Sequence, residues 1–455
     1  MSVNFDTFSK YSVAGPRYTS YPTAIEFSEN FTYDFYISKL KNAQSSRPLS
    51  LYFHLPFCRS ACYFCGCNVV FTSKQDKLER YIEYLKKEIE ILSSHVDTSR
   101  EVIQMHFGGG TPTYFSATQL EEIIGEIKKT FPNFSDESEI SCEIDPRYLT
   151  EEQMQVLTKN GFNRISFGVQ DLDEKVQKAV HRIQPLEINK NAVELARKYG
   201  IKSVNIDLIY GLPYQTFEGF KKTLEQVKGL DPDRLAVFNY AHVPWLMKTM
   251  RKIDETTLPE PSEKLQILRY TIDYLEQNGY KMIGMDHFAK PKDELFLAIE
   301  KNQLHRNFQG YTTKGGADLI GVGLTSIGEG EDYYAQNHKD MKLYEEAIDE
   351  GKLPYTRGVT LSEDDLIRKH VIMQLMSNFK LDINSVEKEY NIIFSDYFSN
   401  AIESLKPYVE DGLLTITKSS IEANATGAML IRNIAMAFDF YTKSHNSKKT
   451  FSKTI

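Results

Sequence analysis

Short hydrophobic runs alternate with amphipathic stretches through the middle of the chain. Most of the runs are apolar on both faces, which is typical of parallel strands covered by helices. We therefore predict strands within residues 49–56, 102–110, 139–146, 164–171, 203–213, 234–244 and 281–289. The stretches between them repeat their hydrophobic residues at helical spacing. They predict helices within residues 75–94, 116–131, 150–160 and 262–279.

Cap residues mark the ends of two of these helices. Thr150 suits the N-cap of the third helix, and Gln153 stands at capping-box spacing from it. Gly279 follows the fourth helix, where glycine readily adopts the left-handed conformation that ends many helices. The strand–helix unit repeats over residues 48–290, which predicts an α/β fold. Either a complete or partial (β/α) barrel or a doubly wound sheet would satisfy this pattern.

The residues that end the predicted strands favour the barrel. Nearly every run ends in polar residues, glycine or proline, at 54–56, 108–112, 143–146, 170–171, 207–213, 239–244 and 286–287. In a barrel all these ends meet at one mouth, where such enzymes build their sites. A doubly wound sheet would concentrate them at one switch point instead. We therefore expect a partial TIM-type (β/α) barrel.

The two ends of the chain have a different pattern from the middle. Residues 304–330 are rich in glycine, threonine and aromatics, and we interpret them as loops packed back against the barrel. From about residue 350 helical patterns dominate, with a hairpin-like stretch at 411–424. We predict three parts, which are an N-terminal lid segment at 1–47, a catalytic barrel at 48–345 and a small, mainly helical domain at 346–455.

Composition excludes several classes of protein. The chain has 455 residues and a formal net charge of −8, which disfavours a nucleic-acid or membrane-surface partner. No apolar run approaches the length of a membrane-spanning helix, and the first residues contain no apolar signal region. Its cysteines are odd in number and clustered, unlike a disulfide framework. We expect a cytoplasmic protein.

Four of the five cysteines lie within "FCRSACYFCGC", residues 57–67. Zinc sites usually join two clips separated by a dozen or more residues. Three cysteines in one loop, separated by three and then by two residues, can instead bind three corners of a [4Fe–4S] cluster. A structural zinc knuckle and incidental buried thiols remain the alternatives. Three protein ligands would leave one iron open, and open metal positions are where chemistry takes place.

Three motifs resemble the radical S-adenosylmethionine (SAM) superfamily. The pattern CxxxCxxC after a first strand is that superfamily's signature, and the stretches "GGGTP" at 108–112 and "DLIYGLPYQT" at 207–216 are similar to its SAM-binding motifs. The resemblance implies that SAM chelates the fourth iron. Electron transfer from the cluster then cleaves SAM to a 5′-deoxyadenosyl radical.

Further strings resemble the oxygen-independent coproporphyrinogen III oxidase family from end to end. They include "GPRYTSYPTA" (15–24), "EIDPR" (143–147), "GFNRISFGVQD" (161–171), "LHRNFQGYTT" (304–313) and "LIRNIAMAFD" (430–439). Related haem chaperones share the cluster and glycine motifs but typically lack the fourth cysteine and the RYTSYPT segment. This chain has both, so it resembles the oxidase rather than the chaperone.

The resemblance implies a role for each matching residue. Cys58, Cys62 and Cys65 would bind the cluster, and Cys67 would lie close to the cofactor without ligating it. The family binds two SAM molecules. The first would contact Tyr52, Gly109, Glu143 and Ile327. The second would contact Phe64, Gly110, Thr111, Gln170, Arg182, Asp207 and Ala241.

The substrate implied by the resemblance is coproporphyrinogen III, a tetrapyrrole with four propionates. We expect Arg17, with Arg306 second, to hold propionates that do not react, beneath a lid formed by the N-terminal segment. Tyr52, Cys67 and Arg17 are therefore the candidates for direct roles in the reaction, and His54 could tune the cluster. An electron donor of flavodoxin or ferredoxin type and an electron acceptor are also implied. A site enclosed by one chain predicts a monomer.

Overall fold

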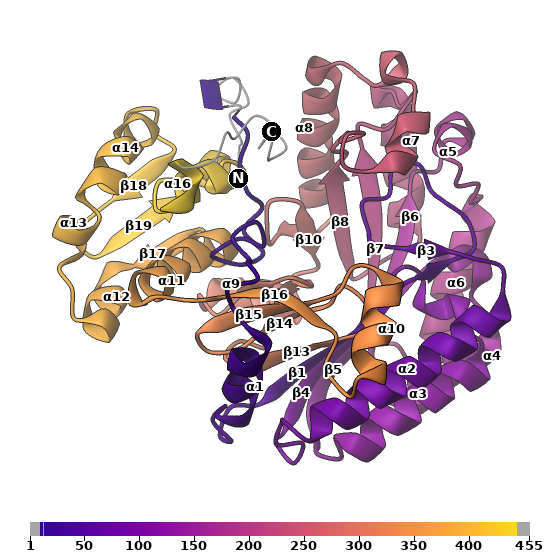
Figure 1. Ribbon diagram of the computed structural model, residues 1–455. Coiled ribbons are helices and arrows are strands. Elements are labelled where there is room, and N and C mark those ends of the chain that lie inside the picture. Colours follow the sequence, from indigo (N-terminus) through magenta and orange to yellow (C-terminus); the bar gives the residue numbers. More distant parts are fainter. Residues whose placement is uncertain (1–9, 12, 444–455) are drawn as a thin grey trace. The chain divides into compact units, whose positions relative to one another are not determined.

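The computed structural model describes residues 10, 11 and 13–443 (Figure 1). The chain folds into two compact units. The barrel unit comprises Phe27–Lys264 and Gly316–Thr360. The C-terminal unit comprises the described residues up to Glu26, Leu265–Gly315 and those from Leu361 onward. Each unit therefore combines segments that are far apart in the sequence, whereas our predicted boundaries at 47/48 and 345/346 divide the chain consecutively.

A curved sheet forms the centre of the barrel unit. Its parallel strands follow the order β1, β4, β5, β6, β7, β8. Their bounds are Leu49–Leu55, Val102–Gly109, Phe134–Ile144, Arg164–Gln170, Ser203–Tyr210 and Arg234–Asn239. All six lie within the predicted runs or extend them by a few residues. The fold class is therefore confirmed as α/β, with parallel strands joined by helices.

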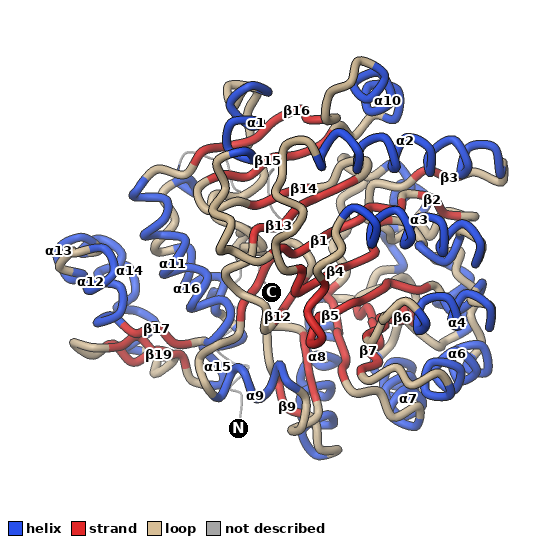
Figure 2. Tube along the Cα trace, turned by 90° about the horizontal axis from the view of Figure 1, so that it is seen from below, coloured by secondary structure: helices blue, strands red, loops and turns tan. Residues whose placement is uncertain are grey.

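Helices cover one face of this sheet, as Figure 2 shows for α2, α3, α4, α6 and α7. Their bounds are Gln75–Ser93, Ala117–Thr130, Glu151–Lys159, Leu186–Lys198 and Phe217–Gly229, with the short α5 at Glu174–Ala179. The predicted capping box of α4 is present, since Thr150 and Gln153 bond each other's backbone N–H groups. Gly279 has a φ of 88°, as expected of the residue that ends α8, Pro261–Gln277.

The other side of β1 carries an extension that the sequence pattern did not reveal. β13 (Asp318–Val322) pairs with β1 in parallel, and three antiparallel strands continue the sheet. These are β14 (Ile327–Glu329), β15 (Tyr333–Asn337) and β16 (Tyr355–Thr360). The interpretation of residues 304–330 as loops is thus wrong. β13 forms because a strand distant in sequence, β1, supplies its hydrogen-bond partners.

A buried ion pair holds this junction together. Asp318 of β13 is 5% exposed and accepts hydrogen bonds from Arg100 at 2.6 Å and from Arg47 at 2.7 Å. α1 (Tyr33–Lys41) and α10 (Met341–Asp349) complete the barrel unit. The short strands β2 (Phe57–Cys58) and β3 (Val70–Phe71) pair in parallel and enclose the cysteine loop.

The C-terminal unit is mainly helical, as predicted. A three-stranded antiparallel sheet in the order β17-β19-β18 accompanies its helices, and β18–β19 is the expected hairpin. The bounds are α11 Glu363–Asn378, β17 Lys380–Asp382, α12 Ile383–Tyr390, α13 Phe394–Tyr397, α14 Ser399–Glu410, β18 Leu414–Ile416, β19 Ser420–Ala423, α15 Ala425–Met429 and α16 Ile431–Met436. Before them come β9 Lys281–Met282, β10 His287–Ala289, α9 Glu294–Glu300, β11 His305–Asn307 and β12 Gly310–Thr312.

The N-terminal segment supplies part of this unit's core. Tyr18 and Tyr21 are fully buried beside Leu375 and Phe438. The Tyr18 hydroxyl donates to Asp439 at 2.7 Å, and Arg432 donates to the carbonyl of Pro16 at 2.9 Å. These bonds explain why the segment is ordered. In the described part of the chain, no helix is long and apolar enough to cross a membrane.

Candidate active site

The cysteine loop is held at the carboxyl end of β1. The amide of Val70 donates to the Pro56 carbonyl at 2.8 Å, and the amide of Tyr63 donates to the Val180 carbonyl at 3.0 Å. A turn within the loop is closed by the amide of Cys65, which donates to the carbonyl of Cys62 at 3.2 Å. The loop is thus fixed at both ends and in its middle, and its sulfur atoms have defined surroundings.

Polar groups of the protein lie beside all three predicted ligand sulfurs. The Cys58 sulfur lies 3.4 Å from the Thr111 hydroxyl oxygen, and the Cys65 sulfur accepts from the Cys67 amide at 3.5 Å. The Cys62 sulfur accepts from Arg182 at 3.5 Å and lies 3.8 Å from an Arg147 nitrogen. Donors of this kind stabilise thiolates, which are the form that binds metal.

Each thiol responds differently to its surroundings. Burial raises the pKa of Cys58 to about 12, so this thiol gives up its proton only when a metal replaces it. A hydrogen bond from the Cys67 thiol lowers the pKa of Cys65 to about 7, and the same contact raises the pKa of Cys67. Cys67 is thereby kept as a neutral donor beside the Cys65 sulfur.

The donor set fits an iron–sulfur cluster. Three soft thiolate ligands come from one loop, with cationic groups directed at one sulfur. Within residues 13–443, no three His, Cys, Asp or Glu side chains converge closely enough to hold one metal ion in common. Thiolates that each bind a different iron of a cluster have no need to converge on one point.

Arg182 lies in a buried charge cluster behind the loop. Its guanidinium donates to Asp145 at 3.0 Å and to the Gly168 carbonyl at 2.6 Å. Arg147 binds the same carboxylate at 2.6 Å. Burial raises the pKa of Asp145, but Arg182 and Arg147 outweigh this effect and leave the pKa below its ordinary value. Arg182 is not a surface residue, because its side chain is only 9% exposed.

The glycine motif runs against β1 and β2 at backbone contact distance. The amide of Gly110 donates to the Leu55 carbonyl at 2.9 Å. A Cβ at Gly110 would lie 2.6 Å from the carbonyl carbon and oxygen of Pro56. Gly109 has a φ of 115°, and a Cβ there would lie 2.9 Å from the His54 ring. Only glycine fits both positions, so the motif positions the loop that begins at Cys58.

A chain of aromatic and polar side chains links Tyr52 to Glu143. The Tyr52 hydroxyl lies 3.0 Å from Nδ1 of His54, and the Tyr52 ring stacks on His106 at 5.9 Å. His106 lies 3.4 Å from the Glu143 carboxylate, which also accepts from the Gly109 amide at 3.4 Å. Burial lowers the pKa of His54, so its imidazole is neutral at physiological pH.

The carboxylate of Glu143 is ionised and accessible to solvent. Desolvation raises its pKa, but the hydrogen bonds from His106 and Gly109 and the charge of His106 bring the net value below the ordinary one. The side chain nevertheless remains 48% exposed. An ionised and accessible carboxylate at a strand end can bind an ammonium group or a ribose diol.

Gln170 and Asp207 lie on neighbouring strands, around the carbonyl that Arg182 binds. Gly168 pairs with Asp207 across β6 and β7. The Asp207 carboxylate accepts from Ser166 at 2.8 Å and from Asn205 at 2.7 Å. Gln170 has a φ of 71°, a strained conformation for a residue with a side chain, and such strain is often found at functional sites.

The three remaining predicted contacts are apolar. Phe64 is half-buried and packs on the hydrophobic cluster that contains Tyr240, the residue before Ala241. Ile327 begins β14 and is half-buried. A Cβ at Gly321, the partner of Tyr52 across β1 and β13, would lie 2.6 Å from the Ile327 carbonyl oxygen. Tyr52 and Ile327 therefore lie on opposite sides of β13, two strands apart in the sheet.

Sequence reasoning missed several residues of this site. The stretch "EIDPR" assigns no role to Asp145 or Arg147, and no motif distinguishes His106. The one available signal was their position at the ends of β4 and β5, beside Gly108 and Glu143. That Arg147 and Arg182 share Asp145 depends on strand order, which the sequence does not specify.

Arg17 and Arg306 belong to the C-terminal unit, where they surround Asp286 together with Arg432. Burial raises the Asp286 pKa, but His287, Arg306 and Arg17 outweigh it and hold that pKa far below its ordinary value. Burial together with the charges of Arg17 and Arg306 lowers the pKa of Arg432 to about 9. Arg306 also has two buried guanidinium nitrogens, Nε and Nη1, without a hydrogen-bond partner.

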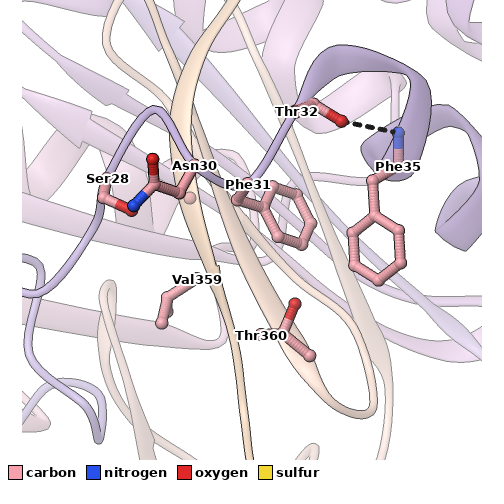
Figure 3. A pocket seen from close by; sticks show the side chains of 8 residues that line it. Ser28, Asn30, Phe31, Thr32, Phe35, Val359 and Thr360 are labelled. Carbon is pink, nitrogen blue, oxygen red and sulfur yellow. Dashed lines mark hydrogen bonds between the residues drawn. The ribbon is translucent and has the colours of Figure 1, made fainter.

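A shallow pocket of about 420 Å³ lies beside the edge strand β16 (Figure 3). Ser28, Asn30, Phe31, Thr32, Phe35 and Gly358–Thr360 line it. The Thr32 hydroxyl accepts from the Phe35 amide and caps α1. The lining carries no ionisable group, so it lacks the chemistry found around the cysteine loop.

Comparison with known proteins gives consistent matches over the whole chain. The Radical SAM superfamily matches residues 52–227, and the HemN C-terminal domain matches residues 361–430. The chain is 59% identical over 460 residues to oxygen-independent coproporphyrinogen III oxidase from Helicobacter pylori strain J99, covering 100% of both.

Two further matches come from Escherichia coli. The oxygen-independent coproporphyrinogen III oxidase of strain K12 is 46% identical over 446 residues, covering 98% of this chain and 97% of that protein. The solved structure of coproporphyrinogen III oxidase (HemN), described as a radical SAM enzyme, has a TM-score of 0.93 at 44% identity. It covers 97% of this chain and 99% of that chain.

Proposed function

The chain belongs to the family of oxygen-independent coproporphyrinogen III oxidases within the radical SAM superfamily, and we propose that it catalyses the reaction of that family in haem biosynthesis. Two propionate side chains of coproporphyrinogen III would become vinyl groups, giving protoporphyrinogen IX. Each propionate loses one hydrogen atom, one CO2 and one electron. Oxygen is not required, because a carbon radical takes the hydrogen atom and an external acceptor takes the electron.

We propose Cys58, Cys62 and Cys65 as the ligands of a [4Fe–4S] cluster, with Cys67 as a neighbouring thiol donor. When bound, the cluster supplies the electron that cleaves SAM to a 5′-deoxyadenosyl radical. Two arginines direct their donors towards the Cys62 sulfur. Positive charge there stabilises the reduced, more negative state of the site.

Two SAM molecules are proposed, each beside its own set of residues. The first would lie near Tyr52, Gly109, Glu143 and Ile327, where the ionised Glu143 can hold a ribose diol or the methionyl ammonium. The second would lie near Phe64, Gly110, Thr111, Gln170, Arg182, Asp207 and Ala241. Arg182 offers a planar fork for the methionyl carboxylate, and its Nε is buried without a hydrogen-bond partner.

We propose the arginine group of the C-terminal unit as the anchor for unreactive propionates. Three arginines, Arg17, Arg306 and Arg432, gather near Asp286 in a chain of net charge −8. Carboxylates would also satisfy the partnerless nitrogens of Arg306. The N-terminal segment that carries Arg17 would act as a lid.

The electron donor and the electron acceptor are proposed from what the reaction requires. The cluster needs a one-electron donor, of flavodoxin or ferredoxin type, and each decarboxylation needs an electron acceptor. A monomer in the cytoplasm would suffice, because all the proposed ligands come from one chain.

The proposed function rests mainly on the hydrogen-bond donors that lie beside the three sulfurs of the CxxxCxxC loop. The test is anaerobic incubation of reconstituted protein with coproporphyrinogen III, SAM, a reductant and an electron-accepting extract. We expect protoporphyrinogen IX and 5′-deoxyadenosine to form together. A Cys58→Ser variant should lose the cluster absorbance and both products.

Arginine variants test the anchor separately. Arg306→Gln should raise the KM for coproporphyrinogen about tenfold or more while leaving SAM binding unchanged, because it removes one charge-assisted contact. Arg80→Gln is the matched control, since Arg80 is an exposed arginine whose partner is Glu345. If Arg306→Gln and Arg80→Gln behave alike, the anchor is refuted, and absence of vinyl product from loaded enzyme refutes the proposed function.

A further inference from the structure

The segment that follows β8, residues 245–253, is packed directly against the cysteine loop. Met247, Met250 and Ile253 belong to one hydrophobic cluster with Tyr63 and Phe64, the two residues between Cys62 and Cys65. The 3-10 helix η4, Lys248–Lys252, lies within this segment. The ammonium group of Lys252 lies 4.9 Å from the centre of the Tyr63 ring. One side of the segment therefore covers the loop that we propose as the cluster site.

The other side of the segment is apolar and exposed. Trp245 is the only tryptophan of the chain and is 60% exposed, and the adjacent Leu246 is 65% exposed. Tryptophan is rarely left in water and is enriched at the centres of protein interfaces. The contacts of the segment with the barrel come from its methionines and Ile253, so its fold does not need Trp245 on the surface.

Positively charged residues follow these apolar residues in the sequence. Lys248, Arg251 and Lys252 are exposed, and residues 245–253 contain no acidic residue, in a chain of net charge −8. Two exposed acids, Asp254 and Glu255, follow the segment; Asp254 accepts from the Thr256 amide at 3.0 Å and Glu255 lies 3.1 Å from His242.

A further cation lies on the cysteine loop itself. Arg59 directly follows Cys58, is exposed, and stands 5.3 Å from the centre of the Tyr148 ring. The His181 ring stacks on Tyr63 at 5.1 Å. Cationic side chains therefore occur both on the loop, at Arg59, and on the segment that packs against it.

We infer that Trp245, Leu246, Lys248, Arg251 and Lys252, together with Arg59, form the docking surface for a small acidic one-electron donor protein. The inference rests on the proposed function, because only a cluster that must be reduced from outside needs such a surface. Electron transfer requires a close approach, and this surface adjoins the residues next to the ligand cysteines. Electron-transfer complexes are small and transient, held by charge complementarity around a few apolar contacts.

The test measures cluster reduction rather than product. Reconstituted holoenzyme is mixed anaerobically with flavodoxin hydroquinone, and the loss of cluster absorbance is followed by stopped flow. In the double variant Lys248→Glu/Arg251→Glu, the second-order rate constant should fall about tenfold or more at low ionic strength. The difference from the unmodified protein should shrink as salt is added. Trp245→Ala should weaken the complex at all salt concentrations.

Two controls separate docking from damage. Lys129→Glu/Lys342→Glu makes the same change of net charge on exposed helical positions of the same unit and should leave the rate constant within twofold. Reduction by photoreduced deazaflavin, which needs no protein surface, should be unchanged in every variant. Because this assay requires no substrate turnover, a normal flavodoxin rate in protein that makes no vinyl product would refute the proposed function alone.

Three results would overturn the inference. Lys248→Glu/Arg251→Glu could be reduced by flavodoxin as fast as the unmodified protein. It could lose its rate equally with deazaflavin, which would make the segment a support of the cluster rather than a docking surface. It could change the sedimentation coefficient of the protein, which would make this face an interface between two copies of the chain.

Discussion

Gly110→Ala should disturb the cluster loop from outside it. A Cβ at this position would lie 2.6 Å from the Pro56 carbonyl carbon and oxygen and 2.7 Å from the Phe57 carbonyl oxygen. Ordinary contact begins at 3.4 Å, so the chain before Cys58 must move by about 0.8 Å. Both obstacles are backbone, which cannot rotate away as a flexible side chain would.

The magnitude follows from this clash and from two hydrogen bonds. Overpacking costs about 1–3 kcal/mol. The same movement stretches the bonds from the Gly110 amide to Leu55 and from the Thr111 amide to Phe57, both 2.9 Å long, which together are worth about 1–3 kcal/mol at full loss. With partial loss of these bonds, we expect the free energy of unfolding to fall by about 2–4 kcal/mol.

Two measurements check this expectation. Urea unfolding of the cluster-free protein gives the change in free energy. Iron and sulfide analysis after anaerobic reconstitution shows whether the displaced Cys58 still binds, and we expect substoichiometric iron. Gly125→Ala in α3 is the matched control, because no atom lies within 4 Å of its added Cβ. It should stabilise the protein by about 0.5–1 kcal/mol and leave the iron content unchanged. If Gly110→Ala unfolds like the unmodified protein and binds full iron, the reasoning is refuted.

Three further outcomes are expected elsewhere in the chain. Asp318→Ala leaves the buried Arg100 without its carboxylate partner and should lower the free energy of unfolding by about 3–5 kcal/mol in urea titrations; a loss below 1 kcal/mol would contradict this. Burial raises the pKa of Glu88 from 4.5 to about 7, so the native state keeps a proton that the unfolded chain releases at lower pH. Its stabilising contribution is therefore full below pH 4.5 and is lost as pH rises towards 7, by up to about 1.4 kcal/mol per pH unit; Glu88→Gln should remove this slope from the pH dependence of unfolding, and an unchanged slope would exclude Glu88 as its source. Arg182→Lys keeps the positive charge but loses the planar guanidinium, which donates to the Gly168 carbonyl and which we propose binds the methionyl carboxylate of SAM. SAM affinity measured by calorimetry should therefore fall about tenfold. Equal affinity would remove Arg182 from the SAM site.

The sequence predicted the regular part of the fold well. All six parallel strands from β1 to β8 lie in the predicted runs or extend them by a few residues, because strands buried on both faces leave continuous apolar stretches. The capping box at Thr150 was equally visible, since it depends on residues three apart. The interpretation of 304–330 as loops failed because β13 is short and draws its hydrogen bonds from β1, which lies far away in the sequence.

The residues of the candidate site also fall into those that a sequence motif indicates and those that only the fold brings together. The cysteine spacing, the glycine motif and the family resemblance are the source of every ligand proposed for the barrel unit, and these assignments stay predictions. They gave no role to Arg147, which shares Asp145 with Arg182 and lies beside Cys62. The neutral state of His54 was also out of reach, because it depends on burial.

The features that can be predicted from the amino-acid sequence are local, namely the strands, the caps, the thiol spacing and the glycines required where two backbone segments are in contact. These features are recorded in residues a few positions apart, so the physical rules that produce them can be read along the chain. Which charged groups converge, and how far the pKa of each is shifted, depends on the folded arrangement of the chain. The pairs that set those shifts come from different strands and loops, and their distances exist only once the sheet order has placed them together.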